Sequence, residues 1–254
     1  MFTNYSYVFL VSAFILLLAM IGTIVLTLQK KFTSKSQLIY QQVLRRSNES
    51  IKIYNLKKRP KNNPLIVHYL NIQRLKKDCH LNDDFIRLYK KFCPGPLTFI
   101  LDLKKSSNIS KIITNKKNTL AVRFPKHPIT RTLLKILKFP LAAPSANPSS
   151  RVSAVTSADV KEDFGKKIKY VLEGGKSSIG VESTIVDVRK NPQILRLGGL
   201  NVSIIQKTLG KKISINNKLS KISSPGQLKV HYSPGVPIRM NAKNFRKGEA
   251  YLLI

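Results

Sequence analysis

The sequence has no tryptophan, only two cysteines and very few acidic residues. The 254-residue chain contains 12 Asp and Glu against 45 Lys and Arg, which gives a formal net charge of +33. Cys79 and Cys93 lie far apart, and neither belongs to a CxxC pair. The sequence therefore indicates neither a disulfide framework nor a zinc site. We expect two free thiols, buried or half-buried, in a reducing compartment.

Signatures of covalent and metal catalysis are also missing. The chain has no GxSxG elbow and no Ser-His-Asp spacing. The GGKSS segment (174–178) is similar to the end of a phosphate-binding P-loop, but Tyr170 stands where the first glycine is required. Glu182 and Asp187 have no second acidic cluster beside them, so a metal cage held by the protein is not expected.

The excess of positive charge favours a polyanionic partner, such as nucleic acid, a phosphate-rich ligand or an anionic membrane. The basic residues are dispersed along the chain rather than gathered in one arm or stripe. Compositional drift is therefore the favoured explanation of the charge, and a polyanionic partner stays open as the alternative.

The N-terminal segment is unusually apolar. Residues 1–29 contain no charged side chain, and residues 7–28 are long enough to cross a hydrocarbon core of ~30 Å, for which about 20 apolar residues suffice. Lys30 and Lys31 follow at once and predict that the rest of the chain is cytoplasmic. We expect a transmembrane helix over 1–29, anchored in the inner membrane, and a basic linker over 30–45. A core helix or a cleaved signal peptide fits less well, because the segment has no polar face and no basic residue before it.

The remainder alternates short apolar runs with helical patterns, which predicts an α/β domain over 46–210. Expected strands are 64–70, 94–103, 119–125, 168–175, 183–188 and 193–198, and expected helices are 82–92, 129–139, 157–165 and 201–210. Asn82 is a candidate helix N-cap, and Gly165 and Gly210 are candidate helix stops. Residues 211–237 have no periodicity and are interpreted as a linker, and 238–254 as the start of a truncated second domain.

Several polar residues stand at positions typical of ligand contacts. Lys57 and Arg59 lie two apart in an extended segment and could clamp a polyphosphate, although a solvated basic turn is the simpler explanation. Arg123 lies in an apolar strand, where an arginine needs either an acidic partner or an anionic ligand such as a carboxylate. The scarcity of acids favours the ligand, whereas His127 is interpreted as a structural turn residue. The hydroxyl groups of APSAN (143–147) and GVESTIVDV (180–188) follow or begin strands, where ligands of α/β sheets bind.

Seven motifs in this order closely resemble the YrdC-like threonylcarbamoyl-AMP synthases, in their longer two-domain form. They are KKRPKNNPLIVH (57–68), FCPGPLTFIL (92–101), AVRFPKHP (121–128), PLAAPSANPSSRVS (140–153), GGKSSIGVESTIVDV (174–188), ILRLGGL (194–200) and SPGQLKVHYSP (224–234). The resemblance covers about residues 46–237. It implies a twisted open mixed α/β sheet with a basic concave cavity. It also implies a nucleotidyltransferase that joins L-threonine, bicarbonate and ATP into threonylcarbamoyl-AMP and pyrophosphate, for the t6A37 modification of tRNA.

The same resemblance implies a set of site residues. Lys57 and Arg59 would hold the ATP phosphates and act in catalysis, with Mg2+ carried by the phosphates. The rest of the ATP site would comprise Asn63, Thr119, Ser145, Asn147, Ser153, Arg196 and Tyr232, with Tyr232 closing over the nucleotide from the 211–237 linker. The L-threonine site would comprise His68, Arg123, Ala143 and Ser183. Implied partners are tRNA or double-stranded RNA and the complex that transfers the threonylcarbamoyl group to tRNA.

The chain departs from the family pattern in three places. Nothing in residues 1–45 is similar to the family's PTETVYGLG-like segment, which helps to form the threonine pocket. Lys58 replaces the glycine of KGRP, and Leu197 replaces the proline that usually follows ILR. These departures keep two alternatives open, namely a family member that binds ATP or RNA without turnover and a general basic RNA-binding protein.

Overall fold

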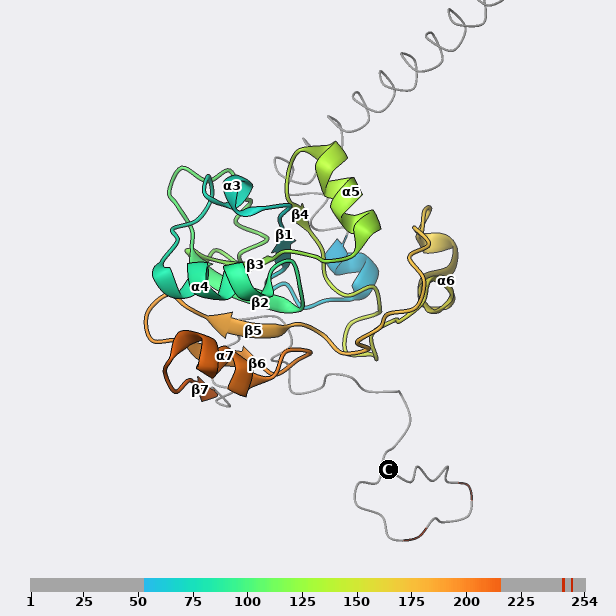
Figure 1. Ribbon diagram of the computed structural model, residues 1–254. Helices are drawn as coiled ribbons and strands as arrows, with labels where there is room; N and C mark the ends of the chain where they lie inside the picture. The colour runs from blue at the N-terminus through green and yellow to red at the C-terminus, as the bar shows by residue number, and fades with distance from the viewer. Residues whose placement is uncertain (1–52, 216–243, 245–247, 249–254) are drawn as a thin grey trace, which may run out of the picture.

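A computed structural model describes residues 53–215, 244 and 248 (Figure 1). Its centre is a mixed seven-stranded sheet with the strand order β4-β1-β3-β2-β5-β6-β7. The strands are β1 (Ile66–His68), β2 (Leu97–Asp102), β3 (Thr119–Arg123), β4 (Leu141–Ala142), β5 (Thr184–Asp187), β6 (Gln193–Arg196) and β7 (Ser214–Ile215). The helices are α3 (Ile72–Leu75), α4 (Asp83–Phe92), α5 (Pro128–Leu137), α6 (Ser157–Phe164) and α7 (Val202–Leu209), with a 3-10 turn, η1 (Gly165–Lys167). The predicted α/β class is confirmed.

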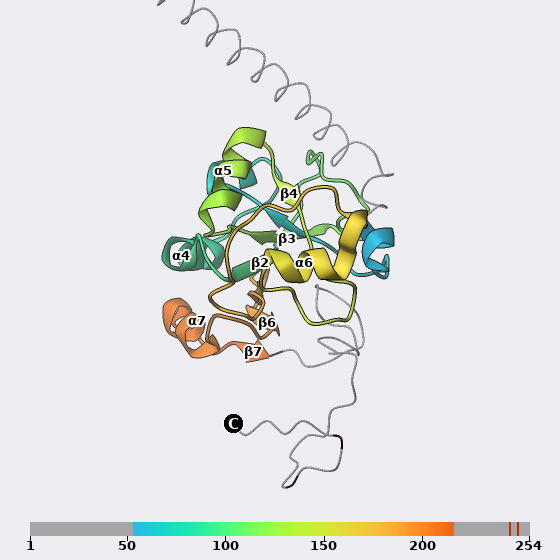
Figure 2. The same ribbon diagram turned by 90° about the vertical axis from the view of Figure 1, so that its right-hand side faces the viewer.

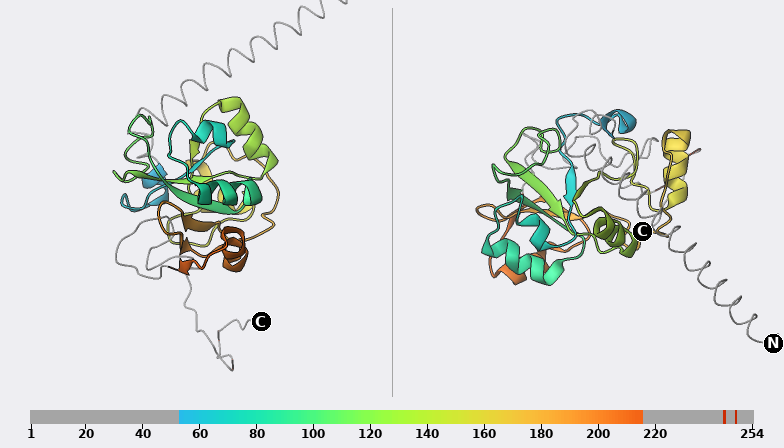
Figure 3. Two further views of the ribbon diagram at one scale, coloured as in Figure 1. Left: turned by 60° about the vertical axis from the view of Figure 1, so that its left-hand side comes forward. Right: turned by 90° about the horizontal axis from the view of Figure 1, so that it is seen from above.

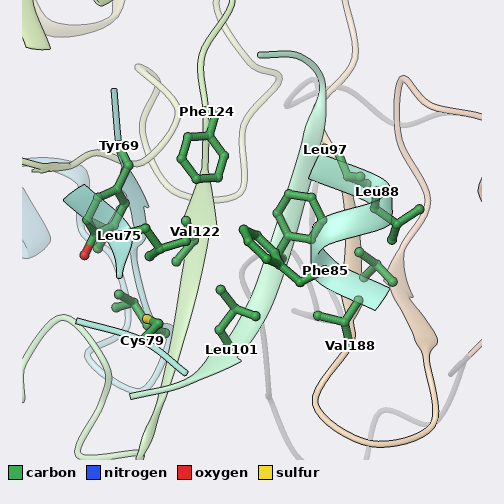
Figure 4. Close-up of a cluster of buried hydrophobic side chains, with 14 of the residues drawn as sticks. Tyr69, Leu75, Cys79, Phe85, Leu88, Leu97, Leu101, Val122, Phe124 and Val188 are labelled. Carbon is green, nitrogen blue, oxygen red and sulfur yellow. The ribbon is translucent and has the colours of Figure 1, made fainter. Parts of the chain in front are cut away.

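One face of the sheet carries the main hydrophobic core. Phe85 and Leu88 of α4 pack against Phe99, Val122 and other buried strand residues (Figure 4). The rings of Phe85 and Phe99 meet edge to face, with 4.9 Å between their centroids. Helix α7 joins the same cluster through its buried residues. Two views turned by a right angle place α4 and α7 on one side of the sheet and α6 on the other (Figures 1 and 2).

The opposite face has a smaller apolar floor. It consists of five buried residues from five strands: Ile66, Ile100, Ala121, Ile185 and Leu195. Because side chains alternate between the faces of a strand, these residues point away from the α4 and α7 layer. Seen from above, α6 lies well apart from α4 and α7, and α5 lies between them (Figure 3). The candidate site described below lies on this second face.

Local sequence signals account for the helix boundaries. The Asn82 side chain accepts a hydrogen bond from the Phe85 amide at 2.9 Å, as expected of an N-cap. Gly210 ends α7 with φ +70°, and Gly165 ends α6, so both predicted stops are confirmed. A capping box between Thr156 and Asp159 starts α6.

Three parts of the prediction differ from the structure. Lys57, predicted in an extended segment, is the last residue of a short helical stretch over 53–57. Residues 168–175, predicted as a strand, form no strand, and Tyr170 is 78 % exposed. Strand β5, the nearest strand along the chain, pairs with β2 on one edge and with β6 on the other, so 168–175 cannot pair with it. Conversely, α3 and β7 were not expected, because elements this short have no readable period. Strand β7 lies within the stretch interpreted as a linker.

Other expectations fall on residues that the structure does not describe. The N-terminal span, the basic linker and Tyr232 lie outside the described ranges. None of the helices within the described part of the chain has the length and apolar character needed to span a bilayer. The anchor over 7–28 therefore stays a prediction. Both cysteines are free, with Cys79 buried and Cys93 half-buried, as expected.

Candidate active site

The strand register places four polar side chains and Ile185 in one row across the sheet. His68 of β1 lies beside Arg123 of β3, and Arg123 lies beside Thr98 of β2. Thr98 is in turn level with Ile185 of β5, which pairs with Arg196 of β6. Residues from five strands thus form a single transverse line, three members of which were singled out from the sequence.

A cavity of about 370 Å³ opens above this row. Its charged or ionisable lining residues are Arg59, His68, Arg123, Glu182 and Arg196. Its neutral lining residues are Ile66, Thr130, Leu133, Leu141, Ala143, Pro144 and Ser145. A cavity of this size, in which apolar side chains stand beside convergent polar groups, is typical of a small-molecule site. Three guanidinium groups against one carboxylate favour an anionic ligand, which agrees with the predicted basic cavity.

Arg123 has a buried hydrogen-bond donor that a ligand could satisfy. Its Nε atom is buried and has no hydrogen-bond partner among the described residues. Burial, and then the neighbouring charge of Arg196, lower the pKa of Arg123. A buried donor without an acceptor is costly, and a carboxylate can accept two parallel bonds from a guanidinium. Of the two explanations that the sequence left open, the structure therefore favours an anionic ligand for Arg123.

His68 faces the same cavity as a neutral imidazole. Burial, together with the nearby charge of Arg123, lowers the pKa of His68 to about 4. Its Nδ1 atom lies 3.3 Å from the carbonyl oxygen of Leu141 in β4. The ring can therefore exchange hydrogen bonds with a ligand at neutral pH without adding a further positive charge to the cavity.

Arg196 is held tightly by its surroundings. Its Nε and Nη2 atoms donate to the Ser183 carbonyl oxygen at 3.1 and 2.9 Å, and Nη1 donates to Glu182 Oε2. Beneath it, the hydroxyl groups of Ser183 and Thr98 are 2.7 Å apart, and both residues are buried. Ser153 donates to the other oxygen of Glu182 at 3.1 Å. Ser153, Glu182, Ser183 and Arg196 therefore form one continuous hydrogen-bonded wall.

Lys57 lies beside the cavity rather than in its wall. The side chain is buried, and its ammonium group donates to the carbonyl oxygens of Ser145 and Asn147 and, at 3.4 Å, to Asn147 Oδ1. Burial, and then the charge of Arg59, lower the pKa of Lys57 to about 8. The Ser149 amide also donates to the Lys57 carbonyl oxygen at 2.8 Å. Lys57 thus organises the loop that carries Ser145 and Asn147.

Arg59, in contrast, lines the cavity. Its Nη2 and Nε atoms donate to the carbonyl oxygens of Pro64 at 2.8 Å and Asn63 at 3.3 Å. The Arg59 amide is bonded to the Tyr54 carbonyl oxygen at 2.8 Å, across a turn in which Lys58 has φ +51°. That backbone conformation favours glycine, which is the family's residue at this position. The Asn63 side chain is buried, and its Oδ1 atom has no hydrogen-bond partner in the described part of the chain.

The remaining predicted residues are more scattered. Ala143 lines the cavity, and its amide donates to the Ile66 carbonyl oxygen at 3.0 Å. Thr119 begins β3 and lines a separate hollow of about 10 Å³. At ~3.3 Å per residue, it lies roughly 13 Å from Arg123 along the strand. Tyr232 lies outside the described residues.

Sequence reasoning did not identify Glu182 and Thr98 as parts of the binding site. Glu182 was considered only as a metal ligand, although it directly precedes Ser183 in a quoted motif. Thr98 was visible as the one hydroxyl-bearing residue in the apolar strand LTFILD. His127 occupies the N-cap position of α5 without a capping hydrogen bond from its side chain. Its Nε2 atom lies 3.0 Å from the Gly174 carbonyl oxygen, in keeping with the structural role expected of it.

The acidic side chains do not assemble a metal site. Within residues 53–215, no three His, Cys, Asp or Glu side chains lie close enough together to hold an ion. Glu182 is bonded to Arg196 and Ser153, and Asp187 forms an ion pair with Arg189 at 2.7 Å. These residues therefore do not fit a metal cage provided by the protein.

The family model Sua5/YciO/YrdC, described as "Telomere recombination", matches residues 44–198. The threonylcarbamoyl-AMP synthase of Pyrococcus abyssi is 37% identical over 194 residues, which make up 74% of this chain and 56% of the relative. That of Schizosaccharomyces pombe is 34% identical over 239 residues (82% and 58%), and that of Bacillus subtilis 37% identical over 193 (74% and 55%). The chain thus spans little more than half the length of these curated relatives.

Solved structures show the same fold. Sua5 of P. abyssi complexed with L-threonine superposes with a TM-score of 0.71 at 35% identity, covering 76% of this chain and 57% of that one. YciO of Escherichia coli superposes with a TM-score of 0.59 at 19% identity, covering 68% and 92%. The second match supports the fold alone.

Proposed function

This chain belongs to the Sua5/YciO/YrdC family, and on that basis we propose that it is a threonylcarbamoyl-AMP synthase. The proposed reaction joins L-threonine, bicarbonate and ATP into threonylcarbamoyl-AMP and releases pyrophosphate. The observation that carries the proposal is the buried Nε atom of Arg123, which has no acceptor among residues 53–215 and belongs to a residue that lines a cavity of about 370 Å³. A related Sua5 of known structure was solved with L-threonine.

In this proposal the threonine carboxylate binds Arg123 through two parallel hydrogen bonds. Neutral His68 lies beside it in the same row and can exchange a hydrogen bond with the hydroxyl or amino group of the substrate. Ala143 is small enough to let the substrate approach the backbone, and Ser183 completes the floor through its bond to Thr98. Leu133 and Leu141 offer apolar surface to the threonine methyl group.

The nucleotide is proposed to lie between Arg59 and the loop that carries Ser145 and Asn147. Arg59 would bind phosphate oxygens with the donors that its bonds to carbonyl oxygens leave over. Lys57 would contribute by fixing that loop, and would reach a phosphate only by exchanging a loop carbonyl for it. The wider proposed ATP site also contains Asn63, Thr119, Ser153 and Tyr232, with Arg196 as part of its wall rather than as a phosphate ligand.

The chemistry requires positioning and charge stabilisation more than proton transfer by side chains. The threonine nitrogen takes up CO2 derived from bicarbonate, with loss of a proton, to give a carbamate. A carbamate oxygen attacks the α-phosphorus, and the bond from that phosphorus to the bridging oxygen breaks, so that pyrophosphate leaves. Mg2+, carried by the phosphates, would neutralise part of their charge. Arg59 and Arg123 would hold the two reactants in line.

Further proposals concern the surroundings of the reaction. The product would supply the t6A37 modification of tRNA through a separate transfer complex, and tRNA or double-stranded RNA would contact the basic surface. An inner-membrane anchor over residues 7–28 and a cytoplasmic catalytic domain remain proposals that rest on the sequence pattern alone.

The direct test is pyrophosphate release by the purified full chain. We expect release only when ATP, L-threonine and bicarbonate are all present. Arg123→Gln should abolish threonine-dependent release, whereas Arg87→Gln, an equal change at an exposed residue of α4, should leave it unchanged. ATP binding without any threonine-dependent release would refute the synthase and favour the alternative of a family member without turnover.

A further inference from the structure

Glu182 occupies a particular position in the cavity. It is the one carboxylate among the described lining residues, and it joins two segments distant in sequence. One oxygen accepts a hydrogen bond from Arg196 of β6, and the other accepts one from Ser153 at 3.1 Å. Its backbone is fixed as well, because the Gly199 amide donates to the Glu182 carbonyl oxygen at 2.8 Å. Both side chains of the ion pair are largely shielded, at 10% exposure for Arg196 and 15% for Glu182.

The three arginines of the cavity consequently differ in how much uncompensated charge and how many hydrogen-bond donors they present to an anion. Arg196 is engaged by a full negative charge and by two oxygens of Ser183. Arg59 donates to the neutral carbonyl oxygens of Asn63 and Pro64, so its charge is not compensated by these bonds. Arg123 has a buried donor without an acceptor in the part of the chain that the structure describes. The ion pair with Glu182 thus singles out Arg196 as the arginine whose charge is already balanced.

We propose that Glu182 is an internal counter-ion. It holds Arg196 in the cavity wall by an ion pair, and it thereby limits the affinity of the site for polyphosphate anions. The inference deepens the proposed synthase function, because only that function makes pyrophosphate a product that must leave. The charge balance itself follows from the contacts of Glu182 and does not depend on catalysis.

The physical reason is the strength of electrostatics in a partly shielded cavity. Three guanidinium groups and a nearby ammonium, with no counter-ion, would bind a multivalent anion tightly and release it slowly. One carboxylate at hydrogen-bond distance from Arg196 weakens that attraction. Removing its charge should strengthen pyrophosphate binding by about tenfold at low salt, and by less at high salt. A gain in affinity distinguishes this role from a merely structural one, since a damaged site would bind more weakly.

The test is calorimetric titration of the full chain with inorganic pyrophosphate, at low and at high salt. Glu182→Gln keeps an oxygen that can accept from Arg196 but removes the charge, and we expect about tenfold tighter binding. Glu162→Gln removes the same charge from an exposed position on α6 and should leave the affinity within about twofold of the wild type, because exposed charges are screened. Equal or weaker binding by Glu182→Gln would overturn the inference, as would an equal gain with Glu162→Gln.

A second variant provides an independent test if Glu182→Gln does not fold. The double variant Glu182→Gln/Arg196→Gln removes both members of the ion pair and keeps the net charge of the cavity, so its pyrophosphate affinity should stay close to that of the wild type. A loss of tenfold or more would mean that Arg196 itself binds the anion, contrary to the inference. Threonine-dependent pyrophosphate release is measured in parallel. Its absence from the wild type refutes the proposed function alone, because the shift in affinity can still be observed.

Discussion

Replacing Arg123 by methionine should stabilise the protein while it removes threonine binding. The Nε atom of Arg123 is buried without a partner among the described residues, and the guanidinium lies near Arg196 in the same cavity. A buried donor without an acceptor typically lowers the free energy of unfolding by about 1–3 kcal/mol. The penalty is smaller for Arg123 because its side chain is only half-buried. Methionine has a similar length and no polar hydrogen. We therefore expect the free energy of unfolding to rise by about 1–2 kcal/mol.

Thermal unfolding of the full chain measures both halves of this prediction. In a domain of this size, 1 kcal/mol corresponds to about 2–4 °C in Tm, so the Arg123→Met variant should melt about 2–8 °C above the wild type. Adding L-threonine should raise the Tm of the wild type, because a ligand stabilises the state that it binds, but should leave the variant unchanged. Arg87→Met, at an exposed position on α4, serves as the control and should change neither value.

Two results would refute the reasoning. If Arg123→Met destabilised the protein, the arginine would be a structural element whose partners lie outside residues 53–215. If the variant kept its response to threonine, the ligand carboxylate would bind elsewhere in the cavity.

Three further predictions concern backbone strain and titration. Lys58 and Lys138 have φ values of +51° and +57°, which glycine adopts without strain. We therefore expect Lys58→Gly and Lys138→Gly each to raise the free energy of unfolding, measured by urea titration, by up to about 1 kcal/mol. A loss of stability in both variants would contradict this. The pKa of Lys57 is lowered from 10.5 to about 8, so the unfolded chain binds more protons than the folded one between these values. The wild type should therefore gain stability relative to Lys57→Met as the pH rises from 8 to 10.5, and a constant difference between the two would count against the buried ammonium. The pKa of His68 is lowered to about 4, so its imidazole NMR signals should not move between pH 5.5 and 7.5; a titration midpoint near 6.5 would show that the ring is solvated instead.

The four longer helices, α4 to α7, and most strands were predictable because their signals are local. Asn82 bonds to an amide three residues away, and Gly210 ends its helix through its own backbone conformation. Strands depend on a partner that a single segment does not specify. The predicted strand over 168–175 has a plausible pattern, yet both edges of β5 are taken by β2 and β6, and the segment stays exposed.

The residues of the candidate site likewise fall into those predictable from the sequence and those that only the tertiary structure brings together. The amino-acid sequence by itself identified Arg123, because an arginine in an apolar strand needs an anionic partner whatever the fold. Only the tertiary structure decided that His68 and Arg196 share its row, because that depends on the pairing of five strands. It also decided that Lys57 bonds to a loop 88 residues away rather than facing the cavity, and that Glu182 pairs with Arg196. Local hydrogen bonds are encoded within a few residues, whereas the partners of a buried charge are set by the chain packing around it.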